Sequence, residues 1–167
     1  FDLEMIKRIK KKFLEELNYQ ILKDGGHFEN SPMYHNQIIF DLLDIIQINE
    51  LDKVQNKYLI NIIHKMLHWS ETISHNGEVA YFNDSCINLQ PNYRDLLKYL
   101  KKLKIKKQSK RNSKKSLYHF KNSGFIIFKN NQYKLIFRSG GISSNSIPAH
   151  QHANSLSFEI SNKKGKI

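Results

Sequence analysis

A dozen residues near the start of the chain combine side chains that can move protons. The stretch Asp24–His35 reads DGGHFENSPMYH. After Asp24 it contains two imidazoles, a carboxylate, an amide and a phenol: His27, His35, Glu29, Asn30 and Tyr34. Imidazoles and phenols serve as acids and bases in enzymes, and a tyrosine, whose pKa is about 10 in water, becomes a better base where positive charges lie nearby. The stretch is therefore either a site for proton transfer or a polar connector between two elements.

Two histidines near the other end of the chain, His150 and His152, form a second cluster. They stand two apart in PAHQHAN, so in an extended segment both face the same side. The pair can bind zinc, or one can bind metal while the other meets a substrate, but zinc needs at least three protein ligands. Another pair, His64 and His68, has the four-residue spacing of a helical metal chelate. No acid or third histidine accompanies that pair, which favours a polar helix edge.

The periodicity of apolar residues predicts helices followed by strands. Apolar residues three and four apart predict helices over 2–22, 32–48, 53–74 and 92–104. Alternating residues predict strands over 117–121, 124–129, 132–138 and 155–161, with Asn130-Asn131 as a hairpin turn. Between the first two helices, Gly25-Gly26 permits a sharp turn, and Ser31-Pro32 is typical of an N-cap and a first helical residue. Tyr34 and His35 would then lie in the first turn of the second helix.

The order of these elements favours two packed units, an α+β arrangement, rather than a single βαβ domain. We place a helical unit at 1–105, a basic linker at 106–116 and a strand unit at 117–167. The segment His75–Pro91 is a loop with a turn signal at Asn76-Gly77 and a polar cluster that ends at Asp84. That cluster is either functional or part of an ordered loop pinned by its aromatic residues.

The chain is strongly basic: its 167 residues carry 27 Lys and Arg against 15 Asp and Glu, a net charge of +12. Such an excess favours an anionic partner, whether nucleic acid, acidic glycan or membrane surface. Read alone, the lysine-rich run 101–115 suggests a nucleic-acid patch, but no aromatic residues interleave with its charges for base stacking, so a solvated boundary segment is favoured. Neither a signal peptide nor an apolar run of membrane-spanning length is present. The chain opens within a helix and stops where a strand begins, so we expect a fragment of a longer protein.

Three motifs, taken in order, resemble those of a known family. DGGHFENSPMYH, HNGEVAYFNDS and PAHQHANSLSFEIS look like the heparinase II/III family of polysaccharide lyases. The resemblance covers essentially the whole chain and implies an N-terminal α/α toroid joined to a C-terminal antiparallel β-sandwich. On that basis the chain would hold the last helices of the toroid and the first strands of the sandwich.

The resemblance also implies roles for individual residues. Tyr34 resembles the family's catalytic acid/base, and His150 resembles the residue that helps to hold or deprotonate the substrate. His152 resembles a ligand of a structural zinc ion (Zn²⁺), whose remaining protein ligands would lie beyond Ile167. A family Asn-His pair that neutralises the substrate carboxylate would precede the first residue, so this fragment alone should be inactive. One departure is Asn154, which stands where the family usually has Asp.

These roles imply a lyase that cleaves an acidic, uronic-acid-containing polysaccharide, such as heparin, heparan sulfate or alginate, by β-elimination. We expect Glu29, Asn30 and Asp84 to line the sugar cleft or brace the tyrosine, with hydrogen bonding inside the loops as the alternative. His27 and His35 are expected at the substrate site, where with nearby lysines they would supply the positive field that a catalytic tyrosine needs. The expected partner is the anionic polysaccharide, with no nucleic acid and no membrane span, and the family implies a periplasmic or secreted location. The alternatives are a non-catalytic glycan-binding relative and a basic nucleic-acid-binding module.

Overall fold

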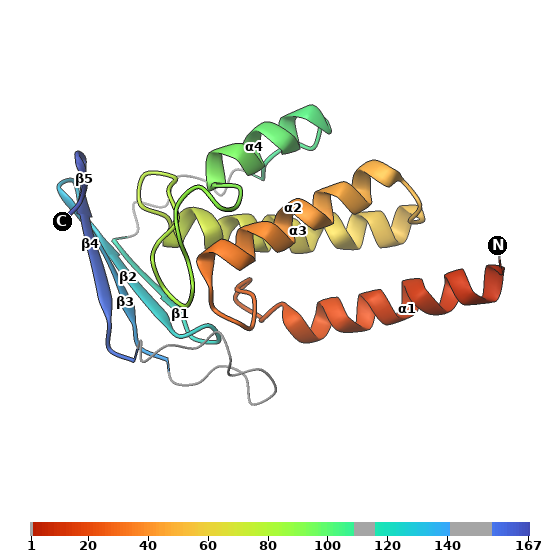
Figure 1. Ribbon diagram of the computed structural model, residues 1–167, viewed down its shortest axis with the longest axis horizontal. Helices are drawn as coiled ribbons and strands as arrows, with labels where there is room; N and C mark the ends of the chain where they lie inside the picture. Colours follow the sequence, from red (N-terminus) through yellow and green to blue (C-terminus); the bar gives the residue numbers. More distant parts are fainter. Residues whose placement is uncertain (1, 109–115, 141–154) are drawn as a thin grey trace.

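The computed structural model describes residues 2–108, 116–140 and 155–167, so the predicted site residues His150 and His152 lie outside the described ranges. Within these ranges the chain forms four α-helices followed by a five-stranded antiparallel sheet, which lies across one end of the helices (Figure 1). The helices are α1 (Leu3–Gln20), α2 (Pro32–Ile48), α3 (Lys53–Ile73) and α4 (Tyr93–Lys102). The strands are β1 (Leu117–Phe120), β2 (Phe125–Lys129), β3 (Tyr133–Arg138), β4 (Phe158–Asn162) and β5 (Gly165–Lys166). The predicted order of helices first and strands second is confirmed, and none of the described helices has the length and apolar character of a membrane span.

Each helix begins after a residue whose side chain caps the free backbone N–H groups. Asp2, Ser31, Asp52 and Asn92 occupy the N-cap positions, and each accepts a hydrogen bond from the backbone of its own first turn. At α2 the first helical residue is Pro32, as the sequence predicts. Because such caps are local signals, the predicted helix ends lie close to the observed ones.

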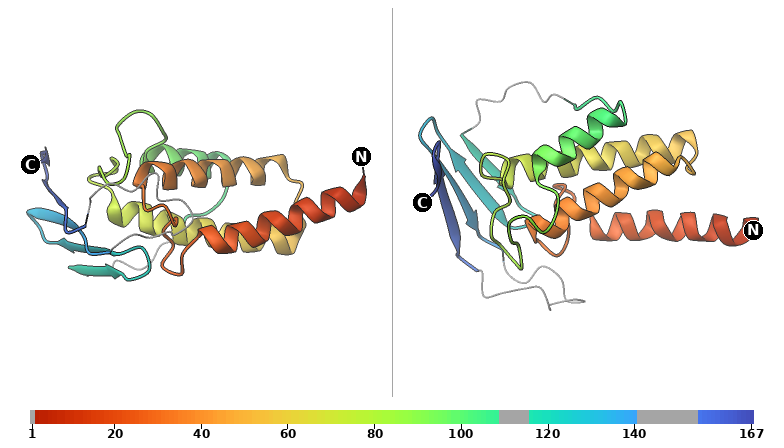
Figure 2. Two further views of the ribbon diagram at one scale, coloured as in Figure 1. Left: turned by 60° about the horizontal axis from the view of Figure 1, so that its bottom comes forward. Right: turned by 45° about the horizontal axis from the view of Figure 1, so that its top comes forward.

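The apolar faces of α2, α3 and α4 enclose one core. Its fully buried members come from all three helices and include Ile39, Leu43, Leu59, Ile63 and Leu96. Helix α1 joins this core near its C-terminal end through Leu17, whereas Leu3 and Ile9 near its start are 80% and 59% exposed. Figure 2 shows this end of α1 extending past the turn between α2 and α3. The periodicity of α1 thus predicts a helix correctly, but only part of its apolar face is buried among the described residues.

The sheet is built from antiparallel neighbours in the chain order β1-β2-β3-β4-β5. The predicted hairpin turn at Asn130-Asn131 joins β2 to β3, and the Asn130 side chain accepts two backbone N–H groups of the turn, at 2.8 and 2.7 Å. Strand β4 starts at Phe158 rather than at the predicted position 155. The reason is that Leu156 has a left-handed φ of 65° and its N–H binds the carbonyl of Arg138, which ends the extended conformation there.

The inner face of the sheet and the end of α3 form a second core. The buried residues come from the sheet, from α3 and from the loop after it: Phe120, Phe125, Ile127, Ile136, Trp69, Ile73, Ala80 and Phe82. Trp69 and Phe125 are fully buried, and their ring centroids lie 5.6 Å apart in an edge-to-face contact. The helices and the sheet therefore share an apolar core in addition to the chain that joins them.

The outer face of the sheet is apolar as well. Leu117, Phe128 and Phe158 on this face are 54%, 42% and 62% exposed. The pairing register and the alternation along each strand place them opposite the residues of the inner face. An exposed apolar sheet face is what one half of a β-sandwich presents to the other, so it supports the predicted sandwich, which stays a prediction.

The loop after α1 turns back sharply at Gly25-Gly26. Gly25 has a φ of +92°, and a Cβ on it would lie 2.6 Å from the backbone oxygen of Lys65 in α3. A Cβ on Gly26 would lie 2.8 Å from both Ser123 Cβ and Trp69 Nε1. The first glycine is needed for its backbone conformation and close approach, and the second lets the loop lie against α3 and the sheet together.

We predict that Gly25→Ala destabilises the protein by about 2–4 kcal/mol, because it combines a positive φ with a clash against backbone atoms. The measurement is urea-induced unfolding of the protein. Gly165→Ala is the matched control, since Gly165 also has a positive φ, +148°, but no atom lies within 4 Å of its Cβ position. Equal losses of stability in the two variants would contradict the prediction.

Candidate active site

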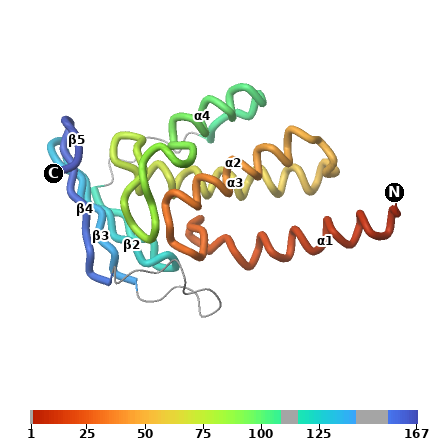
Figure 3. Tube along the Cα trace, in the orientation of Figure 1, coloured from red at the N-terminus to blue at the C-terminus, as the bar shows by residue number. Residues whose placement is uncertain are grey.

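The two polar stretches that the sequence singles out meet at the start of α2. Asn83 Nδ2 donates to the backbone carbonyls of Asn30 (3.2 Å) and Glu29 (3.4 Å). Ser85 Oγ accepts the N–H of Met33 at 3.0 Å and lies 3.0 Å from the hydroxyl of the N-cap, Ser31. Figure 3 shows the loop between α3 and α4 lying beside the segment that leads into α2. Residues about fifty positions apart in sequence are thus fixed against each other around the first turn of α2.

Three of the predicted site residues present surface at this junction. Tyr34, the third residue of α2, is half-buried, and its backbone N–H donates to Ser31 Oγ at 3.4 Å. Glu29 is also half-buried, and Asp84 is exposed with a left-handed φ of 58°. A tyrosine and two acidic residues on adjoining segments are therefore not fully buried. Their roles as acid/base and substrate ligands stay predictions.

His35 lies beneath this junction as a buried, neutral side chain. Its Nδ1 accepts the backbone N–H of His27 at 3.2 Å, so the ring proton is on Nε2, which lies 3.0 Å from the carbonyl oxygen of Met66 in α3. The ring also packs against Trp69, with centroids 4.3 Å apart. Burial lowers the pKa of His35 to about 3. With no exposed surface, His35 holds the loop against α3 and has no face to offer a sugar.

His27 is buried beside it and is neutral for the same reason. Burial lowers its pKa to about 4, although the carboxylate of Glu29 acts in the opposite direction. The prediction that His27 and His35 supply a positive field for the tyrosine is therefore wrong, because at neutral pH neither imidazole is charged. The residue types in the motif indicate chemistry, but the sequence does not reveal that both rings point into the protein.

Asn30 is also fully buried, with a left-handed φ of 55° that asparagine tolerates better than most residues. Its backbone carbonyl is held by Asn83, but neither polar atom of its carboxamide has a hydrogen-bond partner among the described residues. Loop hydrogen bonding by this side chain, the alternative to a role in the site, is thus not observed.

The sheet holds the beginning of the same loop through Ser123, in the turn between β1 and β2. The Asp24 carboxylate accepts the Ser123 N–H at 2.7 Å and its hydroxyl at 3.1 Å, and Trp69 Nε1 donates to the same hydroxyl at 2.8 Å. The buried guanidinium of Arg138 donates to the Ser123 carbonyl. Sequence reasoning misses Ser123 and Arg138, because each acts through partners far away in the chain and neither belongs to a local motif.

The described residues on either side of 141–154, the range that contains both predicted histidines, bind the turn and the end of β3. Gly140 N–H donates to the carbonyl of Gly124 at 3.0 Å, and Leu156 N–H donates to the carbonyl of Arg138 at 2.9 Å. The distance from His150 to Tyr34 and the zinc role of His152 both stay predictions. Among the described residues, no group of three or more His, Cys, Asp and Glu side chains is placed to hold a metal.

Two family models match adjacent parts of the chain. A model described as Heparinase II/III N-terminus matches residues 7–110, and one described as Heparinase II/III-like, C-terminal, matches residues 112–167. The chain belongs to the heparinase II/III family. The resemblance carried by the three sequence motifs is thereby confirmed.

Solved structures share the fold of this heparinase II/III chain. A heparinase III with methylated lysines superposes with a TM-score of 0.76 at 21% identity, over 95% of this chain and 27% of its own length. A mutant of the heparan sulfate lyase HepC from Pedobacter heparinus gives 0.67 at 19% identity, over 94% of this chain and 27% of that protein. This chain therefore spans about 27% of the length of these relatives, and identities this low establish the fold alone. A comparison with curated protein sequences gave no match.

We predict that the protein loses stability as the pH falls from 6.5 toward 4, because unfolding lets His27 and His35 take up protons that the folded protein refuses. Folding lowers both pKa values. Each histidine therefore makes its full contribution to the free energy of unfolding above pH 6.5, and this contribution falls by about 1.4 kcal/mol per pH unit below pH 6.5. Between about pH 4.5 and 6, His35→Gln should lower the slope of unfolding free energy against pH by about 1.4 kcal/mol per pH unit. The measurement is urea unfolding across that range, with His119→Gln on the surface of β1 as the control. An unchanged slope in His35→Gln would show that this imidazole is not held neutral.

Proposed function

We propose that the protein containing this chain is a polysaccharide lyase that cleaves an acidic, uronic-acid-containing polysaccharide by β-elimination. The observation that carries the proposal is Tyr34, a half-buried tyrosine in the first turn of α2 whose backbone is fixed by Ser31 and, through Met33, by Ser85, in a chain of the heparinase II/III family. One relative of the same fold is titled a heparan sulfate lyase, which makes heparan sulfate the first substrate class to test. Alginate-like polymers present the same uronic acid chemistry.

The proposed reaction breaks the bond between C4 of the uronate and the glycosidic oxygen without water. A base removes the C5 proton, the electron pair of that C–H bond forms the C4–C5 double bond, and the leaving oxygen takes up a proton. The C5 proton is hardly acidic while the neighbouring carboxylate is charged, so hydrogen bonds that neutralise the carboxylate lower the barrier. Tyr34 serves as the acid/base in this proposal, and His150 helps to hold or deprotonate the substrate.

The surrounding residues have different parts in the proposal. The carboxylates of half-buried Glu29 and exposed Asp84 accept hydrogen bonds from sugar hydroxyls in this proposal, while Asn30 is fully buried. His27 and His35 act by positioning, since neutral buried imidazoles add no charge to the cleft. We extend the proposal to a structural zinc ion with His152 as one ligand, and to a periplasmic or secreted location. No step of the reaction depends on that metal.

We predict that Tyr34→Phe in the complete protein lowers kcat by about 10²–10⁴-fold, because the variant lacks the proton-transferring hydroxyl while keeping the ring. The measurement is the absorbance of the unsaturated uronate formed from heparan sulfate and, in parallel, from an alginate. Tyr133→Phe, which removes a half-exposed phenol from β3, is the matched control and should leave kcat unchanged.

The same assay separates the alternatives. Wild-type activity in Tyr34→Phe would remove this residue from the mechanism. Glycan binding by the wild-type protein without any unsaturated product would favour a non-catalytic relative, for which Asn154 in place of the family's Asp is the sequence signal.

We predict that KM for a polyanionic substrate rises with salt, because a chain of net charge +12 attracts it electrostatically. Raising the ionic strength from about 0.1 M to about 1 M shortens the screening length from about 10 Å to about 3 Å. The measurement is a salt series of kcat and KM, with the melting temperature recorded at each salt concentration as the control for folding. A KM that does not change with salt would contradict the prediction.

A further inference from the structure

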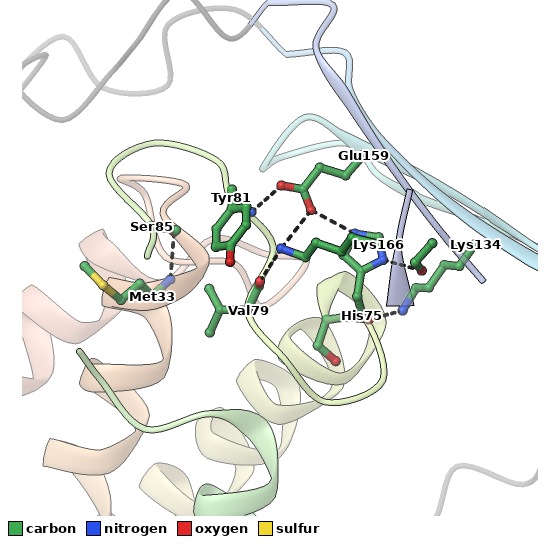
Figure 4. Close-up of polar contacts among 10 residues, drawn as sticks. Met33, His75, Val79, Tyr81, Ser85, Lys134, Glu159 and Lys166 are labelled. Carbon is green, nitrogen blue, oxygen red and sulfur yellow. Dashed lines mark hydrogen bonds and ion pairs between the residues drawn. The ribbon is translucent and has the colours of Figure 1, made fainter. Parts of the chain in front are cut away.

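A compact polar cluster joins the loop after α3 to strands β4 and β5, on the side of that loop away from α2 (Figure 4). We call it the Glu159 cluster; it consists of His75, Glu159, Ser161 and Lys166. His75 Nε2 lies 2.9 Å from Glu159 Oε2, and its Nδ1 lies 2.5 Å from Ser161 Oγ. Lys166 Nζ lies 3.4 Å from the same oxygen of Glu159. One carboxylate is thus placed between an imidazole from the helical side and an ammonium group from the sheet.

The cluster also holds the backbone of the loop and the ring of Tyr81. Glu159 Oε1 accepts the backbone N–H of Tyr81 at 2.5 Å. Lys166 Nζ donates to the carbonyl of Val79 at 2.9 Å and lies 3.2 Å from the centroid of the Tyr81 ring. The sheet therefore grips the loop at His75, Val79 and Tyr81, so the loop has little freedom to move relative to β4.

These contacts are largely shielded from water. The exposed fractions of the side chains are 2% for His75, 15% for Glu159 and 22% for Lys166. Burial acts to raise the pKa of Glu159, but the close contact with His75 and the charge of Lys166 together hold it below its ordinary value. Glu159 is therefore a charged anchor in a protected setting, where ion pairs are screened less than on the surface.

The gripped loop continues directly into the contacts that hold the start of α2. Phe82, next after Tyr81, is buried in the core shared with the sheet. Asn83 then donates to the backbone of Glu29 and Asn30, and Ser85 accepts the N–H of Met33, the residue before Tyr34. Figure 4 shows both ends of this path, with Glu159 at Tyr81 and Ser85 at Met33. Tyr81 is thus separated by four residues of backbone from Ser85, which contacts the first turn of α2.

We propose that Glu159 is a positioning residue for the reaction: by holding Tyr81 and His75 to the sheet, it sets the placement of Tyr34 and Asp84 relative to β4. The inference rests on the proposed lyase function and names a residue of the third sequence motif, PAHQHANSLSFEIS, to which the sequence alone assigns no role. It predicts a fault in geometry rather than in substrate affinity when Glu159 is lost. Displacing a catalytic group by about 1 Å lowers the reaction rate by up to about 100-fold.

The test compares Glu159→Ala and Glu159→Gln in the complete protein, with heparan sulfate as substrate. We expect Glu159→Ala to lower kcat by about 10- to 100-fold while KM changes by less than about threefold, since the binding groups remain. Glu159→Gln should recover part of kcat, because its amide oxygen still accepts the Tyr81 N–H. The matched control is Glu78→Gln, an exposed glutamate of the same loop, which removes the same charge and should leave kcat unchanged.

Amide hydrogen exchange of the same variants keeps the inference testable whatever the activity. In Glu159→Ala we expect faster exchange confined to peptides covering 79–86 and 31–36, with α4 unchanged. Wild-type kcat in Glu159→Ala, or faster exchange spread evenly over the whole chain, overturns the inference. If the wild-type protein forms no unsaturated product, the proposed function fails, and the exchange pattern alone then decides whether Glu159 positions the loop.

Discussion

The indole N–H of Trp69 is fully buried and needs an acceptor inside the protein, and most of the described architecture depends on how that need is met. The acceptor is Ser123 Oγ in the β1–β2 turn, and the same serine is bound by Asp24 at the head of the loop that leads to α2. One hydroxyl therefore joins α3, the sheet and the loop. Gly26 makes this possible, because a Cβ at that position would occupy the space between Trp69 and Ser123.

The loop that starts at this contact is built around neutral imidazoles. His35 accepts the buried N–H of His27 on one side and lies 3.0 Å from the carbonyl oxygen of Met66 in α3 on the other, so it joins the loop to that helix. A charged imidazole there would lose the acceptor that the His27 N–H requires. The two histidines of the motif thus hold the loop in shape, and Tyr34, Glu29 and Asp84 are the predicted site residues that are not fully buried.

The parts of the structure that sequence predicts well are those set by neighbours in the chain. Ser31-Pro32 caps α2, Asn130-Asn131 turns the β2–β3 hairpin, and Gly25 takes the positive φ that only glycine adopts easily. These signals need only a few adjacent residues. The family motifs extend the prediction to the overall order of helices and strands.

The rest depends on contacts between distant residues, which no local pattern encodes. Asp24 meets Ser123 across 99 positions and His75 meets Ser161 across 86, and both contacts arise only once the sheet has packed on the helices. The same packing decides that His27 and His35 are buried, which is why the sequence suggests cations where the structure has neutral rings.

The second core carries a consequence for how such chains are divided. The two family models meet between residues 110 and 112, yet Trp69, Ile73 and Phe82 of the first part are covered by Phe120 and Phe125 of the second. Separating the chain between residues 110 and 112 would expose apolar surface on both parts. Exchanging one half with that of a relative should therefore work only where the two halves match across this core. The new sheet has to supply aromatic residues that cover Trp69, as Phe120 and Phe125 do here.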